Sequence, residues 1–207
     1  MKSRPYERPP GDVVPRAAPP HIYYPLATIK SQGTPSFRSQ AARDFACLLD
    51  VDPDVVSWSS RDEDIDVIFE TEVHTVDFVA ETSDGRIFYH DVGDALPAAP
   101  DWIEFAVQQQ GGIYNAMSME GFTDSFRLLN AKDLLKYGGY RCSLGDRVRI
   151  LSALDDMGSL TVSESLHAFR EGRPMACLAV LILTGFLEIE MDEAPIGPET
   201  VVRRIRD

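Results

Sequence analysis

The stretch VHTVDFVAETSDGRIFYHDV, residues 73–92, decides the fold that we expect for this chain. Apolar and polar side chains alternate from Val73 to Ala80 and again from Arg86 to Val92, which is the period of half-buried β-strands. Between the two runs, Ser83-Asp84-Gly85 supplies the residue types of a tight turn. The stretch therefore predicts a β-hairpin with one face turned toward a core.

Further elements precede this hairpin. Val55 to Ser60 and Ile65 to Phe69 alternate in the same way and predict two more strands. Before them we expect a helix with Ser36 as its N-cap, ending near Asp52-Pro53. Its apolar residues recur at helical spacing: Phe37, Ala41, Phe45, Leu48 and Leu49.

Helical spacing returns after the hairpin, from Trp102 loosely to Met119. A short strand is expected over Ser125 to Leu129, followed by a helix from Ala131 to Tyr137 that stops at Gly138-Gly139. A helix, a meander of strands, and then helix, strand and helix together predict an α/β fold with one sheet.

The last third has a different pattern. An amphipathic helix carries Val148 to Met157, a second helix starts at Thr161 or Ser163, and an apolar third helix runs from Met175 to Thr184. Two alternating runs, Phe186 to Met191 and Thr200 to Ile205, predict a pair of strands. Three helices and a two-stranded wing are typical of the winged variant of helix-turn-helix.

Composition sets the domain limits and excludes some functions. Residues 1–34 hold many of the 14 prolines and are expected to form an extended or disordered arm. Residues 35–140 then make the α/β domain and 141–207 the winged-helix-like domain. The net charge of −13 argues against a surface that grips DNA throughout, because phosphate affinity comes from Lys and Arg.

No segment predicts export or a membrane span. The longest apolar run, Met175 to Leu187, is shorter than the roughly 20 residues that cross a bilayer. The N-terminus lacks the apolar core of a secretory signal, so a cytoplasmic protein is expected. Cys47, Cys142 and Cys177 are odd in number and far apart, which fits neither a disulfide framework nor a zinc knuckle.

Several motifs occur in a characteristic order. Ala42-Arg43-Asp44-Phe45 is followed by an acidic segment around Pro53, by Thr75-Val76-Asp77-Phe78, and by His90-Asp91-Val92-Gly93. This order resembles the TnsA-like endonuclease subunits of heteromeric transposases, over roughly residues 35 to 205. The resemblance implies a PD-(D/E)XK nuclease domain, that is, a restriction-endonuclease-like mixed sheet flanked by helices, before the winged-helix-like domain.

The resemblance also implies a metal site. Asp77 and Asp91 match the two carboxylates that hold Mg²⁺ in that family, whereas the helix Glu is replaced by Ala42 and the Lys by Gly93. Without these two groups, efficient DNA cleavage is not expected, and any Mg²⁺ binding is expected to be weak. We expect the two carboxylates to lie on adjacent strands, with Ala42 and Gly93 facing the same cavity.

Other interpretations of the site remain open. Asp77 and Asp91 are either residual metal ligands or relics at strand ends. Glu81 and Glu104 are candidates for relocated catalytic groups. Gln110 and Tyr114 have a helical spacing that is also seen beside the nuclease pockets of some exonucleases, although chance or core packing is the better explanation. The histidines, His74, His90 and His167, are interpreted as structural.

Arginines concentrate in the last third and form the predicted DNA-binding set: Arg141, Arg147, Arg149, Arg173, Arg203 and Arg204. The predicted third helix is almost wholly apolar, which suits burial better than base contact.

Three functions follow. The first is an impaired TnsA-like protein that binds DNA or protein in a transposition or recombination system, with a transposase or ATPase as partner. The second is an active Mg²⁺-dependent endonuclease with relocated catalytic residues. The third is a winged-helix regulator or scaffold that works through protein contacts.

Overall fold

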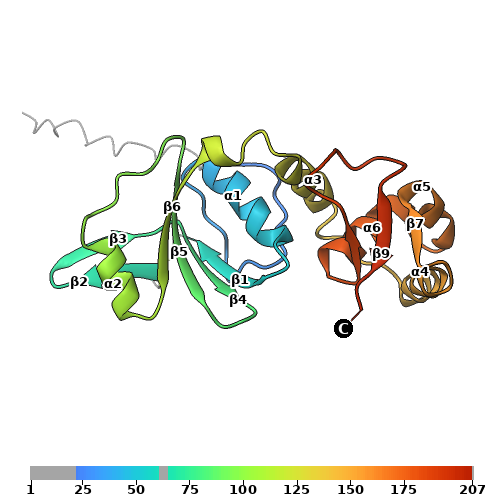
Figure 1. The fold of residues 1–207 in the computed structure, drawn as a ribbon, viewed down its shortest axis with the longest axis horizontal. Helices are drawn as coiled ribbons and strands as arrows, with labels where there is room; N and C mark the ends of the chain where they lie inside the picture. The colour runs from blue at the N-terminus through green and yellow to red at the C-terminus, as the bar shows by residue number, and fades with distance from the viewer. Residues whose placement is uncertain (1–21, 61–64, 207) are drawn as a thin grey trace, which may run out of the picture.

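The computed structural model describes residues 22–60 and 65–206. Its central sheet contains β1 (Val55–Ser60), β4 (Phe78–Thr82), β5 (Ile87–Gly93) and β6 (Ile113–Ser118), in the order β1-β4-β5-β6. β1, β4 and β5 are antiparallel, and β6 runs parallel to β5. The sheet is therefore mixed, as expected, and it divides the flanking elements into two layers (Figure 1).

One face of the sheet packs against α1 (Gln40–Val51). The aromatic rings of Phe45, Trp58 and Phe78 meet there, with centroids 5.6 to 5.7 Å apart. α3 (Phe126–Leu135) lies beside α1 and completes this core. The N-cap of α1 is Ser39, whose hydroxyl accepts a hydrogen bond from the Ala42 amide, so the helix starts later than the expected Ser36.

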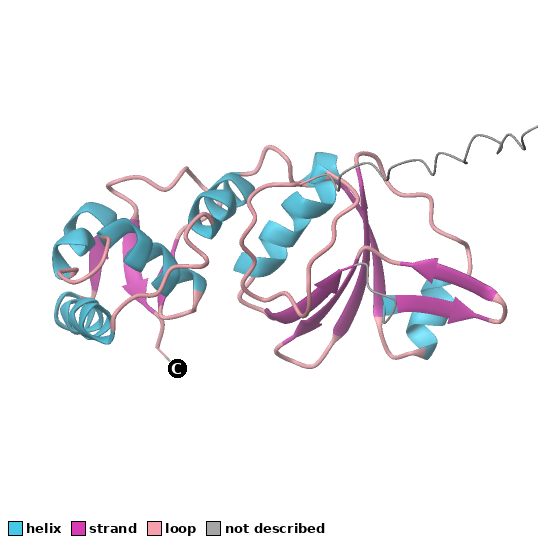
Figure 2. Cartoon of the chain, turned by 180° about the vertical axis from the view of Figure 1, so that it is seen from behind, coloured by secondary structure: helices cyan, strands magenta, loops and turns pink. Residues whose placement is uncertain are grey.

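The opposite face is covered by α2 (Ile103–Gln109) and by a separate hairpin of β2 (Asp66–Phe69) and β3 (Glu72–Thr75). Figure 2 shows this hairpin and α2 at the end of the molecule that lies farthest from the C-terminal unit. The expected single strand from Val73 to Ala80 is wrong. The chain leaves the hairpin at Val76 and Asp77, because Val76 is buried against α2 while Phe78 is buried against α1.

Two further expectations are wrong. The helix expected to continue to Met119 ends at Gln109, and Gly111, at φ 77°, turns the chain into β6. The strand expected over Ser125 to Leu129 is the start of α3, and Ser125 caps it by accepting a hydrogen bond from the Leu128 amide.

The C-terminal unit begins with α4 (Leu144–Met157) and β7 (Ser159–Thr161). Next come α5 (Val162–Ser165), the 3₁₀ turn η3 (Leu166–Ala168) and α6 (Pro174–Leu183). β8 (Leu187–Ile189) and β9 (Val201–Arg204) complete an antiparallel sheet of order β7-β9-β8. The sequence did not predict β7, which has only three residues. Thr161, one of the two predicted starts, caps α5 in a capping box with Glu164.

α6 is buried on two sides. Cys177, Leu178 and Leu181 belong to the core of the C-terminal unit, whereas Ala179 and Leu183 belong to the core that contains α1 and α3. The loop after β8 is bound to α3 as well, since the Asn130 side-chain amide donates to the carbonyls of Met191 (3.0 Å) and Ala194 (2.8 Å). The predicted boundary near residue 140 falls in the connection between α3 and α4, but apolar packing crosses it.

The N-terminal segment that precedes α1 is described from residue 22 onward, so most of the predicted arm 1–34 lies outside the described residues. Arg43 of α1, fully buried, donates to the carbonyls of Pro25 (2.6 Å) and Ala27 (2.7 Å). Among the described helices, none is long and apolar enough to cross a membrane.

Candidate functional site

Asp77 and Asp91 come together where β4 and β5 pair. Phe78 lies opposite His90 in the register, and the Asp77 amide donates to the His90 carbonyl at 2.9 Å. Each aspartate is 1% exposed. His90 contacts the Phe45 ring of α1 at 5.0 Å, so Asp91, the next residue along the strand, points to the other face.

Asp77 is bound by a cation from the protein itself. Its Oδ2 lies 2.6 Å from a guanidinium nitrogen of Arg38 and accepts the Val92 amide at 2.7 Å. The same guanidinium donates to the Val92 carbonyl at 2.7 Å. Arg38 immediately precedes the Ser39 cap, so the start of α1 holds it against the end of β5. Its positive charge therefore neutralises the Asp77 carboxylate.

Asp91 is bound by two neutral or protonatable groups. Its Oδ2 accepts the Tyr114 hydroxyl at 2.7 Å and lies 2.6 Å from His74 Nε2. Burial is the main cause that raises the pKa of Tyr114, and its hydrogen bond to Asp91 adds to the effect, so Tyr114 stays a donor at neutral pH. His74 comes from β3 and Tyr114 from β6, so this cluster ties the separate hairpin to the central sheet.

Ala42 and Gly93 occupy closely packed positions. Ala42 is 1% exposed in the apolar core under α1. A Cβ added to Gly93 would lie 2.7 Å from the Ala95 carbonyl oxygen and 3.4 Å from the Pro97 ring. Gly93 therefore allows a close approach of the 94–97 loop, which a Lys side chain would obstruct.

The donor set does not suit Mg²⁺. Within residues 22–60 and 65–206, no group of three or more His, Cys, Asp or Glu side chains could hold a metal ion. Mg²⁺ prefers an octahedron of oxygen ligands, whereas one oxygen of each aspartate is already bound to Arg38 or to His74 and Tyr114. The carboxylates are positioned by protein groups instead.

The other candidate groups do not join this pair. Glu81 pairs with Ile87 toward the opposite end of β4 and is exposed, as is Glu104 on α2. Gln110 accepts the Tyr89 hydroxyl at 3.3 Å. It ends α2 while Tyr114 lies in β6, so their spacing is not helical. His167 lies in η3 and contacts the backbone carbonyls of Ser163 and Glu164 in the preceding α5.

Sequence reasoning missed Arg38 and the roles of His74 and Tyr114. The local sequence around Arg38 does not indicate that its partner is Asp77. The predicted helix from Trp102 to Met119 included Tyr114, which lies in β6 instead. The residues that carry the family resemblance on α1 have structural partners: Arg43 holds the N-terminal segment, and Asp44 Oδ2 lies 2.7 Å from Lys132 Nζ on α3.

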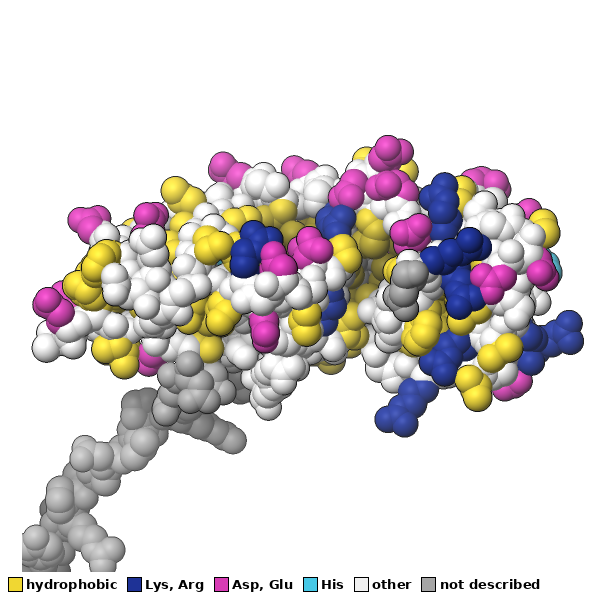
Figure 3. Space-filling view, turned by 60° about the horizontal axis from the view of Figure 1, so that its bottom comes forward, with side chains coloured by type: hydrophobic (Ala, Val, Ile, Leu, Met, Phe, Trp, Pro, Cys, Tyr) yellow, Lys and Arg dark blue, Asp and Glu magenta, His cyan; other side chains and the backbone are white. Residues whose placement is uncertain are grey.

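The predicted DNA-binding arginines differ in their environments. Arg149 is paired with Asp146 (2.7 Å) and Glu171 (2.6 Å), and Arg204 is paired with Asp155. Arg147 lies over the Phe186 ring at 4.9 Å. The other three are exposed and have no ion pair among the described residues: Arg141, Arg173 and Arg203. In Figure 3 the basic side chains of the C-terminal unit are interspersed with apolar and acidic ones.

Asp146 binds the Arg149 side chain, which is therefore not free to contact DNA. Its fully buried carboxylate accepts the backbone amides of Arg170 (2.8 Å), Glu171 (3.2 Å) and Gly172 (2.9 Å). Burial alone would raise the pKa of Asp146, but these hydrogen bonds and the one from Arg149 outweigh it and lower the pKa. The Asp146 carboxylate thus holds the loop before α6 through three backbone amides, and Arg149 neutralises its charge.

Comparison with known protein families found no matching family model, and comparison with curated proteins found no matching sequence.

Proposed function

We propose that this chain is a nuclease-fold protein that does not cleave DNA and works through protein contacts in a transposition or recombination system. The observation that carries the proposal is the ion pair of Arg38 with Asp77, at 2.6 Å, in the position where the TnsA-like resemblance implies a metal ion. A guanidinium neutralises the carboxylate but cannot activate a water as a metal does. The transposase or ATPase partner is part of the same proposal.

Charge supports protein rather than DNA as the partner of the α/β unit. Residues 35–140 contain 7 Lys and Arg against 20 Asp and Glu. Five of these basic side chains form ion pairs with carboxylates, and Arg43 is buried: the five are Arg38, Arg86, Arg127, Lys132 and Lys136. Arg61 lies outside the described residues. This unit has little positive charge to offer a phosphate backbone.

The C-terminal unit supports the same choice. The order α4-β7-α5-α6-β8-β9, with its sheet order β7-β9-β8, is consistent with the winged-helix-like interpretation. In that interpretation α6 would read the major groove. α6 instead packs between the two cores, and the loop after β8 is hydrogen-bonded to Asn130 of α3. The helix that this interpretation assigns to DNA reading is thus used for packing inside the chain.

The test is a combined metal-binding and nicking experiment on the full chain. We expect no heat of Mg²⁺ or Mn²⁺ binding in calorimetry and no nicking of supercoiled DNA. The Arg38→Ala variant should gain weak metal binding, because Asp77 loses its cation. Arg86→Ala, which removes an exposed arginine, should not gain it.

The second candidate function, the active endonuclease, has a distinct signature. Metal-dependent nicking by the natural chain that disappears in Asp77→Ala would establish it and refute our proposal. An active site at Glu81 or Glu104 would instead leave the nicking unchanged in Asp77→Ala and would refute it equally.

A further inference from the structure

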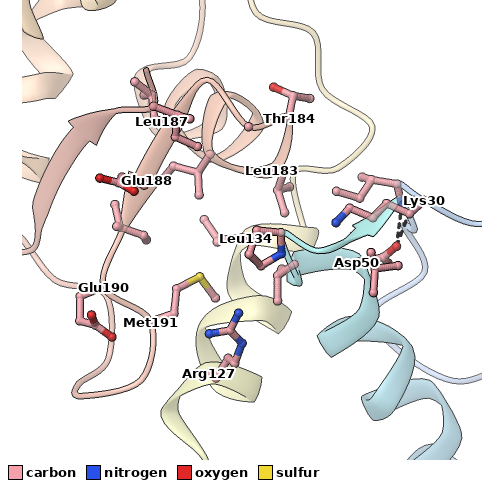
Figure 4. A pocket seen from close by; sticks show the side chains of 18 of the residues that line it. Lys30, Asp50, Arg127, Leu134, Leu183, Thr184, Leu187, Glu188, Glu190 and Met191 are labelled. Atoms are coloured by element: carbon pink, nitrogen blue, oxygen red, sulfur yellow. Dashed lines mark hydrogen bonds between the residues drawn. The ribbon is translucent and has the colours of Figure 1, made fainter. Parts of the chain in front are cut away.

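A cleft of about 780 Å³ separates the C-terminal unit from the α/β unit. Its walls are β8 and the end of α6 on one side, and α3 with the end of α1 on the other. Apolar side chains line its interior, among them Val51, Leu134, Leu183 and Ile189. In Figure 4, Leu134 and Leu183 lie between the β8 side of the cleft and the Lys30 and Asp50 side.

β8 is an edge strand with a free side. β9 is its only partner among the described strands, and Leu187 lies opposite Arg204. The Ile205 amide donates to the Phe186 carbonyl, so the ladder bonds run through Phe186 and, two residues on, Glu188. The peptide groups of Leu187 and Ile189 therefore point away from β9. Such an edge is a template for an added strand.

The charge on this edge favours a cationic occupant. Glu188 and Glu190 are exposed and alternate with the more buried Leu187, Ile189 and Met191. Neither glutamate forms an ion pair within the described residues, but Arg203 lies opposite Glu188 in the register, and the Glu190 carboxylate accepts the Asp192 amide at 2.8 Å. Both cations of the cleft are already engaged: Arg127 with Asp192 at 2.9 Å, and Lys30 Nζ with the Asp52 carbonyl.

We propose that an extended segment of a partner protein adds to β8 in this cleft, with Lys or Arg on both sides of an aliphatic residue. The basic side chains would lie opposite Glu188 and Glu190, and the aliphatic one opposite Ile189, on the apolar side. A second copy of β8 fits less well, because it would place glutamates next to glutamates. This inference rests on the proposed function, in that both require a protein partner.

The test uses the full chain and a fluorescent heptapeptide, Ser-Thr-Lys-Val-Lys-Thr-Ser, followed by anisotropy. We expect saturable binding that weakens with added salt. A peptide with Glu in place of both Lys should not bind. N-methylation of the Val removes one strand hydrogen bond and should weaken binding about tenfold. Equal binding of the N-methylated peptide, or of the Glu peptide, would overturn the proposal.

Two charge reversals make a matched pair. Glu188→Lys should weaken peptide binding about tenfold, whereas Glu199→Lys, which is exposed but lies outside the cleft, should leave it unchanged. Ile189→Pro removes an outward amide, and circular dichroism shows whether the variant keeps its fold. Binding unaffected by Glu188→Lys contradicts the site.

Two further outcomes identify other occupants. A concentration-dependent mass in light scattering that Glu188→Lys alters would show that β8 binds a second copy, contrary to the proposal. Stronger peptide binding after removal of residues 1–21 would show that this segment fills the cleft instead. Peptide binding by a chain that also nicks DNA would refute the proposed function and leave this inference standing.

Discussion

At the scale of single residues, the site contains charged groups that depend on one another. Asp77 is 1% exposed, whereas the Arg38 side chain is 39% exposed. Solvent therefore screens the arginine and lowers the contribution of the ion pair to the free energy of unfolding. Removing Arg38 nevertheless leaves a buried carboxylate that only its other hydrogen bonds stabilise.

We expect Arg38→Ala to lower the free energy of unfolding by about 1–3 kcal/mol, measured by urea denaturation. Asp77→Asn removes the charge and should make the loss of Arg38 less costly, so the double variant should be more stable than the sum of the single effects implies. Simple additivity would show that the pair contributes nothing.

His90 predicts a dependence of stability on pH. Burial lowers its pKa from 6.5 to about 4, although the nearby Asp91 charge opposes the shift. Between these two values the unfolded chain binds a proton that the folded chain does not, so stability falls as the pH falls from 6.5 to 4. The loss should reach about 3 kcal/mol at the low end.

Urea denaturation at several pH values tests this against His90→Phe, which keeps a ring beside Phe45 and Phe88. Below pH 6.5 the free energy of unfolding of the natural chain should fall relative to that of His90→Phe, because the variant lacks the titrating group. Parallel pH profiles would mean that His90 is not the cause.

At the scale of elements, the sequence predicted well where a local pattern was sufficient. Alternation located β1 and β5 and placed His90 and Asp91 on opposite faces, and Ser83-Asp84-Gly85 forms the expected turn, with Gly85 at φ 80°. It failed at Val76, where burial against α2 interrupts the alternating run. Nothing local signalled the Arg38 to Asp77 pair, because its members are far apart in the sequence.

Close packing around α1 and β5 leads to a prediction on restoring the nuclease groups. Ala42→Glu would place a carboxylate in an apolar core, and Gly93→Lys would bring a Cβ to 2.7 Å from the Ala95 carbonyl. We expect each change to destabilise the chain, by about 1–3 kcal/mol for Gly93→Lys. Thermal denaturation and the nicking assay test this together. A stable double variant that cleaves DNA would contradict it.

The loop before α6 gives a further prediction. Asp146→Ala should lower the free energy of unfolding by about 3–5 kcal/mol, because three backbone amides and Arg149 lose their acceptor. Hydrogen exchange should show the largest increase at the amides of residues 170–172. The exposed Asp156→Ala is the control and should leave both measurements unchanged.

At the scale of the whole molecule, the charge distribution predicts weak and salt-sensitive DNA binding. Arg147 and Arg149 were both expected to contact DNA, but Arg149 is held by Asp146 and Glu171. Plots of log affinity against log salt should therefore flatten by about one unit at most in Arg147→Ala and should change little in Arg149→Ala. A steep slope that both variants flatten equally would restore a DNA-binding role.

The packing of α6 into both hydrophobic cores has a consequence for folding during synthesis. Leu183 and Met191 belong to the same core as Phe45 and Leu134, yet they leave the ribosome well after these two residues. Until these residues are synthesised, the apolar side of α3 in the nascent α/β unit stays exposed to solvent. A stalled or truncated product would carry that apolar surface into the cell, where chaperones and proteases recognise such a surface.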